Sequence, residues 1–253
     1  MTTDSTSLFL GSWLNSGSSI VAELMAASGL DFVTIDMEHS PVGITELAEL
    51  LRAIRSGSAH CKALVRTPGP AYEDLKRYLD AGADGVIVPL VNDAETAKAV
   101  VNAVKYPPQG HRGVGFARDN GYGTRLLERL KEANEQSFVC VQIEHIEAIE
   151  NLSEILAVPG LNAAFLGPYD LSASMGIPGE FEHPKYQEAC RSFLKGCQQA
   201  KLLAGIHVVP PDPQAVLARQ AEGYRMIAYS LDITLLTSSL ENGITKIKEG
   251  LNV

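Results

Sequence analysis

Eight short apolar runs alternate with amphipathic helical patterns along the chain, and this alternation most constrains the fold. Most of the runs are almost continuously apolar, which is typical of parallel strands covered on both faces. Alternating strands and helices predict a parallel sheet. The predicted strands are 8–13, 32–38, 61–66, 85–91, 138–144, 163–170, 204–209 and 225–230. The predicted helices are 19–29, 45–57, 71–82, 93–104, 124–136, 147–158, 183–201, 212–223 and 232–250.

Eight such units favour a (β/α)8 TIM barrel of the α/β class over a doubly wound open sheet. A dinucleotide-binding open sheet would carry a G-x-G-x-x-G turn after its first strand, and GSWLNSGSS at 11–19 lacks that turn. The 253 residues suit one barrel, and no change in composition divides them. We therefore expect a single barrel domain over residues 1–253.

Charge and composition narrow the class of partner. A formal net charge of −9 argues against binding to a nucleic-acid backbone, although a few arginines in a cleft could still hold a small anion. The amino-terminal stretch does not resemble a signal peptide, and no apolar run approaches the roughly 20 residues of a membrane span. The four cysteines form no CxxC pair. We expect a cytoplasmic protein that binds neither nucleic acid nor membrane.

Polar side chains gather where several predicted strands end. In a barrel, these carboxyl-terminal ends meet at one mouth, where catalytic groups lie. One charge at a strand end is explained by contact with water, but several converging ends predict a cleft of both signs that suits metal-assisted chemistry on an anion. The residues concerned are Asp36, Glu38, His39, Arg66, Gln142, Glu144 and Asp170.

The residue types at the mouth indicate separate roles. Glu144 and Asp170 end neighbouring strands, so their carboxylates could offer the oxygen ligands that Mg²⁺ or Mn²⁺ prefers; structural salt bridges are the alternative. Arg66 is suited to bidentate capture of a carboxylate. His39 is suited to proton transfer, with Asp36 or Glu38 holding its ring.

Other polar residues fit catalysis less well. His207 and His111 are expected to be satisfied or exposed histidines. A Schiff-base mechanism needs a lysine at a strand end, and Lys62 lies at the start of its strand, so that mechanism is disfavoured.

Six motifs, in order, resemble the class II, metal-dependent pyruvate aldolases of the HpcH/HpaI family, such as the 4-hydroxy-2-oxoheptanedioate and 2-keto-3-deoxy sugar acid aldolases. They are IDMEHSP (35–41), LVRTPG (64–69), AGADGVIVPLVNDAETA (81–97), YPPQGHRGVG (106–115), VQIEHIEAIENL (141–152) and FLGPYDLSASMG (165–176). The resemblance implies a (β/α)8 barrel whose last helix is swapped between subunits of a homo-oligomer, a hexamer built as a trimer of dimers.

The resemblance also implies the site. Glu144 and Asp170 match the ligands of a divalent metal (Mg²⁺, Mn²⁺ or Co²⁺), and Arg66 matches the arginine that stabilises the enolate. The remaining matches are His39 in proton transfer with Asp36 behind it, Glu38 holding metal-bound water, Gln142, Gly167 and Pro168 lining the pyruvate pocket, and Trp13 as an aromatic at the mouth.

The implied activity is cleavage and formation of 4-hydroxy-2-keto acids, giving pyruvate and an aldehyde through a metal-stabilised enolate. Alternatives are oxaloacetate decarboxylation or another enolate-forming reaction, macrophomate synthase-like or citrate lyase-like, and a non-catalytic barrel that binds keto acids. The loop FARDNGYGT (116–124) departs from the sugar acid aldolases. Its Arg118 and Tyr122 would alter the second-substrate pocket if the loop covers the mouth.

Overall fold

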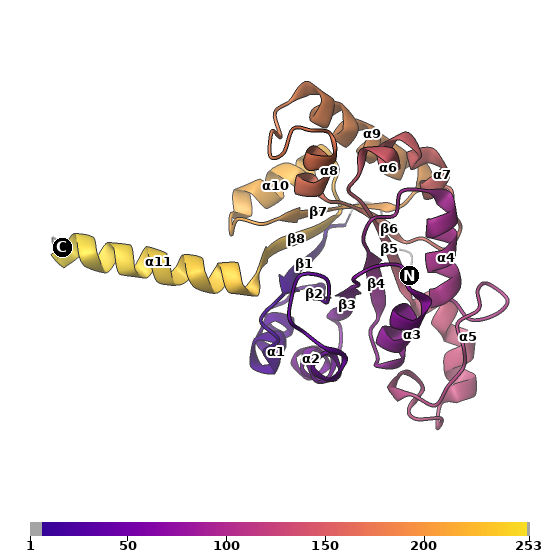
Figure 1. The fold of residues 1–253 in the computed structure, drawn as a ribbon. Coiled ribbons are helices and arrows are strands. Elements are labelled where there is room, and N and C mark those ends of the chain that lie inside the picture. Colours follow the sequence, from indigo (N-terminus) through magenta and orange to yellow (C-terminus); the bar gives the residue numbers. More distant parts are fainter. Residues whose placement is uncertain (1–6, 252–253) are drawn as a thin grey trace.

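Eight parallel strands close into a barrel in the computed structural model, which describes residues 7–251 (Figure 1). The predicted (β/α)8 fold is confirmed. The ends of the predicted domain, 1–6 and 252–253, lie outside the described residues. The strands are β1 (Phe9–Leu14), β2 (Phe32–Asp36), β3 (Lys62–Arg66), β4 (Gly85–Val88), β5 (Phe138–Ile143), β6 (Ala163–Leu166), β7 (Leu203–Val208) and β8 (Met226–Leu231).

Each strand pairs with the next in sequence, and β1 closes the barrel against β8. The helices of the outer ring connect consecutive strands, as expected for parallel pairs. They are α1 (Ser19–Ala27), α2 (Ile44–Gly57), α3 (Tyr72–Asp80), α4 (Ala94–Val104), α5 (Leu126–Gln136), α6 (Ile146–Glu150), α7 (Leu152–Leu156), α8 (Pro168–Ser174), α9 (Pro184–Ala200) and α10 (Pro213–Glu222), with the 3-10 turn η1 (Arg118–Asn120) between α4 and α5. One further helix, α11 (Asp232–Leu251), follows the last strand.

The barrel interior is filled by aromatic and aliphatic side chains, so it is a packed core rather than a channel. Phe32, Phe165 and Trp13 are among the buried side chains of this cluster. Gly11 leaves room for the Phe32 ring, since a Cβ at Gly11 would lie 2.4 Å from that ring. Successive strand residues face opposite sides, so the interior takes every second residue.

A second apolar layer lies between the strands and the helices. On α2 the buried residues are Leu47, Leu50, Leu51 and Ile54, at helical spacings of three and four. They pack in one cluster with strand residues such as Val33. Helices therefore cover the outer face of the strands, which explains why the strands are apolar on both faces.

Two predicted boundaries are wrong. The run at 163–170 is not one strand: β6 ends at Leu166, and α8 begins at Pro168, because proline fits the first position of a helix. The predicted helix 147–158 is divided at Asn151 into α6 and α7. Asp170 therefore lies in the first turn of a helix and not on a strand.

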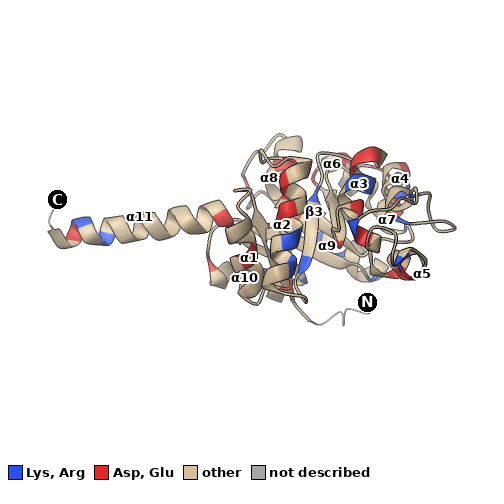
Figure 2. Cartoon of the chain, turned by 90° about the horizontal axis from the view of Figure 1, so that it is seen from below, with Lys and Arg blue, Asp and Glu red and all other residues tan. Residues whose placement is uncertain are grey.

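The last helix, α11, projects away from the barrel in both views (Figures 1 and 2). Its apolar residues are largely exposed to solvent: Ile233, Leu236, Leu240, Ile244, Ile247 and Leu251. Within residues 7–251, no helix has the length and apolar character that a membrane crossing requires.

Candidate active site at the barrel mouth

The interior face of the barrel changes from apolar to polar at the carboxyl-terminal ends of the strands. Asp36 and Arg66 are paired directly across β2 and β3 in the strand register, and Gln142 follows two residues after the interior Cys140. The same two-residue period that fills the core therefore brings these polar side chains to one mouth.

Arg66 and Asp36 form a bidentate ion pair at the mouth. Arg66 Nε lies 2.9 Å from Asp36 Oδ1, and Arg66 Nη2 lies 2.7 Å from Asp36 Oδ2. The remaining terminal nitrogen, Arg66 Nη1, lies 3.3 Å from Glu38 Oε2. Arg66 was predicted to offer its fork to a substrate carboxylate, but within the chain Asp36 occupies that fork.

Asp36 is completely buried and accepts hydrogen bonds from several donors. Besides Arg66, these are Asn15 Nδ2 at 2.8 Å and the backbone amides of Glu38 at 3.1 Å and His39 at 3.2 Å. Burial raises the pKa of Asp36, but Arg66 and the two amides outweigh burial, so the pKa lies below its ordinary value. Asp36 is therefore an ionised anchor for Arg66 and for the backbone that carries His39.

His39 and Glu38 face one another at the rim of the mouth. His39 Nε2 lies 3.7 Å from Glu38 Oε2, and 65% of the His39 side chain is exposed. Asp36 contacts the backbone amide of His39, so Glu38, rather than Asp36, is the carboxylate beside the ring. Burial raises the pKa of Glu38, although Arg66 and His39 lower it. An accessible imidazole beside a carboxylate is suited to proton transfer.

Glu144 is a buried carboxylate held by two neighbours. Its Oε1 accepts a hydrogen bond from Leu90 N at 2.8 Å, and its Oε2 accepts one from Gln142 Nε2. Burial raises the pKa of Glu144; the Leu90 amide lowers it, and the charges of Asp170 and Glu38 raise it further. Since these carboxylates influence one another, they share one region of the mouth.

The residues at the mouth suit a divalent cation whose coordination shell is completed by substrate or water. A Cβ at Gly167 would lie 2.7 Å from Glu144 Oε2, so the β6–α8 connection lies directly against this carboxylate. The buried Oε1 of Gln142 has no hydrogen-bond partner in the described part of the chain. Clustered carboxylate oxygens suit Mg²⁺ or Mn²⁺. Among residues 7–251, no group of three His, Cys, Asp or Glu side chains could hold a metal ion alone.

Trp13 lies between Arg66 and His207. The Arg66 guanidinium carbon is 4.0 Å from the centre of the Trp13 ring, and the His207 ring is stacked on Trp13 at 5.1 Å. His207 Nε2 lies 2.8 Å from Ser230 O. Burial lowers the pKa of His207 to about 4, so its ring is neutral near pH 7. His207 was predicted to be a satisfied histidine, and it also supports the aromatic ring on which Arg66 rests.

Arg118 and Tyr122 lie far from this mouth within the chain. Arg118 Nη1 donates to Ala81 O at 3.1 Å, beside the amino-terminal end of β4, and lines a cavity with Lys62, the first residue of β3. Tyr122 interacts with Arg52 of α2. Within one subunit, this loop therefore does not cover the mouth. It lies along α3 and leads to the opposite end of the barrel.

Two supporting groups were missed by the sequence reasoning. Asn15 directly follows β1 and donates to Asp36, so its position after a strand was a signal that could have been used. The Leu90 amide, which holds Glu144, gives no sequence signal because any non-proline residue supplies a backbone amide. Three residues were predicted to line the pyruvate pocket. Gln142 and Gly167 lie against Glu144, and Pro168 follows directly as the first residue of α8.

The chain is similar to known proteins along most of its length. The HpcH/HpaI aldolase/citrate lyase family model matches residues 10–239. A 2-keto-3-deoxy-L-rhamnonate aldolase from Escherichia coli (strain UTI89) is 35% identical over 247 residues, covering 96% of this chain and 90% of the relative. Aldolases such as this relative are carbon–carbon lyases.

Solved structures extend the match. An HpcH/HpaI aldolase/citrate lyase family protein from Burkholderia cenocepacia J2315 has a TM-score of 0.92 and 33% identity, covering 97% of this chain and 96% of that one. The citrate synthase SbnG has a TM-score of 0.86 and 28% identity, covering 98% and 96%. The chain belongs to the HpcH/HpaI aldolase/citrate lyase family and is a carbon–carbon lyase.

Proposed function

We propose that this protein cleaves 4-hydroxy-2-keto acids to pyruvate and an aldehyde, and that it forms them from the same two molecules in the reverse reaction. The observation that carries the proposal is the meeting of the ionised Asp36–Arg66 pair with the coupled carboxylates Glu144 and Asp170 at one barrel mouth. The similarity to a 2-keto-3-deoxy-L-rhamnonate aldolase supports a sugar-acid-derived substrate.

The proposed cofactor is a divalent metal ion, Mg²⁺, Mn²⁺ or Co²⁺, held by Glu144 and Asp170. When bound, such an ion acts as a Lewis acid toward the keto acid oxygens. Gln142 and Gly167 lie against Glu144 and shape the wall of the pyruvate pocket. Pro168 extends that wall, and Glu38 is proposed to hold the water that completes the metal shell.

Arg66 is proposed to stabilise the negative charge that develops on the keto oxygen as the carbon–carbon bond breaks. The bidentate bond to Asp36 and the ring of Trp13 fix its guanidinium, so little reorganisation is needed during reaction. Because Asp36 holds two of the nitrogens, Nη1 of Arg66 is the donor best placed to reach the substrate.

His39 is proposed to accept and return the proton of the substrate 4-hydroxyl group. Its ring is mostly exposed at the rim, where an incoming aldehyde would lie, and Glu38 is the neighbouring carboxylate. Asp36 contributes by holding the His39 backbone and not its ring.

The experiment that tests this proposal is exchange of the pyruvate methyl protons in D₂O, followed by NMR. We expect exchange with added Mg²⁺, Mn²⁺ or Co²⁺, none with EDTA, and a large loss in Glu144→Gln. Lys195→Gln on α9, an exposed change away from the mouth, is the matched control. Absence of exchange with every metal, while pyruvate still binds, would refute the lyase and favour a keto-acid-binding barrel.

A second candidate reaction is decarboxylation of oxaloacetate or condensation through the same chemistry. The similarity to the citrate synthase SbnG favours it, at 28% identity over nearly the whole chain. Rates of oxaloacetate decarboxylation and of aldol cleavage of 4-hydroxy-2-keto acids, measured on one preparation, distinguish the two. A decarboxylation rate far above every aldol rate would make the second candidate the function.

A second copy of the chain is the proposed partner of α11. An isolated helix gains little stability without packing, and the apolar residues of α11 are exposed within one subunit. Exchange of α11 between neighbours would bury them and build a dimer, with three dimers forming a hexamer. Leu236→Glu with Leu240→Glu should reduce the mass measured by light scattering, whereas Lys246→Glu on the same helix should not. An unchanged hexamer in the double variant would refute the swap.

The proposed compartment is the cytoplasm. Cys61, Cys140, Cys190 and Cys197 are all free, as expected for a protein kept in a reducing environment.

A further inference from the structure

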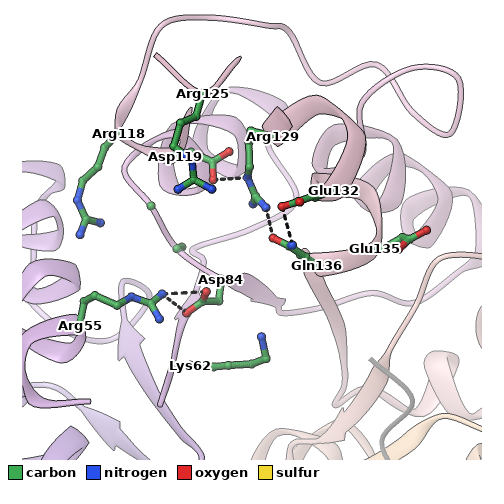
Figure 3. Close-up of a pocket in the computed structure, with 12 residues that line it drawn as sticks. Arg55, Lys62, Asp84, Arg118, Asp119, Arg125, Arg129, Glu132, Glu135 and Gln136 are labelled. Atoms are coloured by element: carbon green, nitrogen blue, oxygen red, sulfur yellow. Dashed lines mark hydrogen bonds and ion pairs between the residues drawn. The ribbon is translucent and has the colours of Figure 1, made fainter. Parts of the chain in front are cut away.

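A cavity of ≈ 540 Å³ lies at the amino-terminal end of the barrel, opposite the proposed active site (Figure 3). Lys62 lines this cavity, whereas Arg66, at the other end of the same strand, belongs to the mouth. Four residue-to-residue steps along the strand separate the Cα atoms of the two by about 13 Å. The volume lies within the range of small-molecule sites.

The cavity has more cations than the rest of this acidic chain would suggest. Five basic side chains and four carboxylates line it, although the chain as a whole has a net charge of −9. The basic residues are Arg55, Lys62, Arg118, Arg125 and Arg129, and the acidic residues are Asp84, Asp119, Glu132 and Glu135. The lining therefore holds one more cation than carboxylates, in a chain that is acidic as a whole.

Three of the five cations already have a carboxylate partner. Arg55 Nη2 lies 2.9 Å from both oxygens of Asp84, and Arg129 Nε lies 2.7 Å from Asp119 Oδ1. Arg125 pairs with Glu128, outside the cavity lining, at 2.9 Å. These pairs fix the walls of the cavity.

Arg118 and Lys62 are different, because neither has a carboxylate within ion-pair distance in residues 7–251. Arg118 donates to the Ala81 carbonyl, and its guanidinium points toward the Arg55–Asp84 pair in Figure 3, where the Lys62 ammonium also reaches toward the cavity. Burial lowers the pKa of Arg118, and the neighbouring charges of Arg52 and Arg55 lower it further. An anion beside Arg118 would relieve its repulsion with Arg52 and Arg55.

We propose that this cavity binds a phosphate-bearing small molecule, with its phosphate between Arg118 and Lys62. The planar guanidinium of Arg118 can form two parallel hydrogen bonds to a phosphate, and Lys62 adds a point charge. Glu132 and Glu135 on the other side can accept hydrogen bonds from hydroxyl groups. These carboxylates would repel a long polyanion, so a compact sugar phosphate fits better than a nucleic acid.

Calorimetric titration of the metal-free protein with ribose 5-phosphate tests the proposal, and EDTA keeps a metal at the mouth from capturing phosphate. We expect binding of ribose 5-phosphate, weaker binding of inorganic phosphate, and no binding of ribose. Arg118→Ala and Lys62→Gln should each weaken binding by about tenfold or more. The matched control is Arg191→Ala, an exposed arginine on α9 paired with Glu188, which should change nothing.

Three outcomes would overturn the proposal. Ribose 5-phosphate bound with equal affinity by Arg118→Ala, Lys62→Gln and the unaltered protein would place the phosphate elsewhere. Displacement of bound ribose 5-phosphate by pyruvate would place it at the mouth. No binding by the unaltered protein, together with a lower oligomeric mass of Arg118→Ala, would assign the cavity to a contact between subunits. Circular dichroism of both variants confirms that each is folded.

Discussion

The two ends of the barrel hold their charged side chains in opposite ways. At the mouth, the buried carboxylate of Asp36 accepts both nitrogens of the Arg66 fork and three further donors. At the amino-terminal end, Arg118 donates to a single carbonyl and faces other guanidinium groups. The charges at the mouth are therefore fixed by one another before substrate binds. At the other end some charges are also paired, such as Arg55 with Asp84, but Arg118 has no carboxylate partner within residues 7–251.

Removal of the Asp36 carboxylate should have the largest effect on stability. Asp36→Ala leaves Arg66 partly buried without its anion and leaves the amides of Glu38 and His39 without an acceptor. We expect the free energy of unfolding to fall by about 3–5 kcal/mol. Urea denaturation measures this change, and pyruvate proton exchange should be lost in the same variant.

The matched control is Asp84→Ala at the other end of the barrel. Asp84 also forms a bidentate pair, with Arg55, and accepts a bond from Ala63 N, but 22% of its side chain is exposed. We expect a cost of about 1–2 kcal/mol because water can replace part of what is lost. Equal costs at Asp36 and Asp84 would contradict the contrast between the two ends.

Glu144→Gln should separate activity from stability. Loss of a metal-holding carboxylate should slow metal-dependent pyruvate exchange by about 100-fold or more. The pKa of Glu144 is raised, so the folded protein holds the proton more tightly than the unfolded chain. Ionisation above that pKa therefore costs stability, and the cost disappears as the pH falls.

Without metal at pH 7, Glu144→Gln should consequently be more stable than the unaltered protein by on the order of 1 kcal/mol. The difference should vanish in acid, where Glu144 is protonated in both the folded and the unfolded chain. Urea denaturation in EDTA at two pH values measures it. A variant that is less stable at pH 7 would show that the carboxylate contributes mainly through its bond to Leu90 N.

The sequence alone was sufficient for the barrel and for much of the mouth. The apolar runs locate the strands, and the two-residue period of a strand places Asp36, Arg66 and Gln142 on the inner face. Glu144 follows directly after β5. Even the Asp36–Arg66 pair follows from register, since neighbouring parallel strands bring these two residues opposite one another.

The path of the 105–125 segment could not be predicted in the same way. It depends on Arg112, which is buried on Tyr106 and bonded to Asp80 at 2.7 Å and Asp119 at 3.1 Å. The contact with Asp80 joins residues 32 apart in sequence, and none of these contacts follows a strand or helix period. The sequence therefore left open whether the loop that carries Arg118 covers the mouth. Division of the predicted helix at Asn151 was missed for a similar reason, because its apolar pattern continues through the break.

His207 should contribute a smaller effect, through Trp13. His207→Ala removes the ring stacked on Trp13, so Arg66 loses part of its support, and activity should fall by about 3- to 10-fold. His207→Phe keeps an aromatic ring there and should retain more of the activity. Equal losses in the Ala and Phe variants would assign the effect to the bond with Ser230 O and not to the stack.

The same two variants test the titration of His207. Its pKa is lowered from 6.5 to about 4, so between those pH values the unfolded chain binds a proton that the folded protein excludes. Stability should therefore fall as the pH decreases from about 6.5 to about 4, and His207→Phe should flatten that part of the profile. Denaturation midpoints measured across this pH range provide the comparison.

Arg118→Ala, at the amino-terminal end, should have the smallest effect on stability, in contrast to Asp36→Ala at the mouth. The side chain gives up one bond to Ala81 O, but its removal also relieves repulsion from Arg52 and Arg55, so the net change should lie within about 0.5 kcal/mol. Salt screens like-charge repulsion, so any gain in the variant should shrink as the salt concentration rises. Urea denaturation at low and high salt measures the change in the free energy of unfolding and its dependence on salt. A loss as large as that of Asp36→Ala would mean that Arg118 is a structural anchor, and the amino-terminal cations would then be committed to the fold rather than available to a ligand.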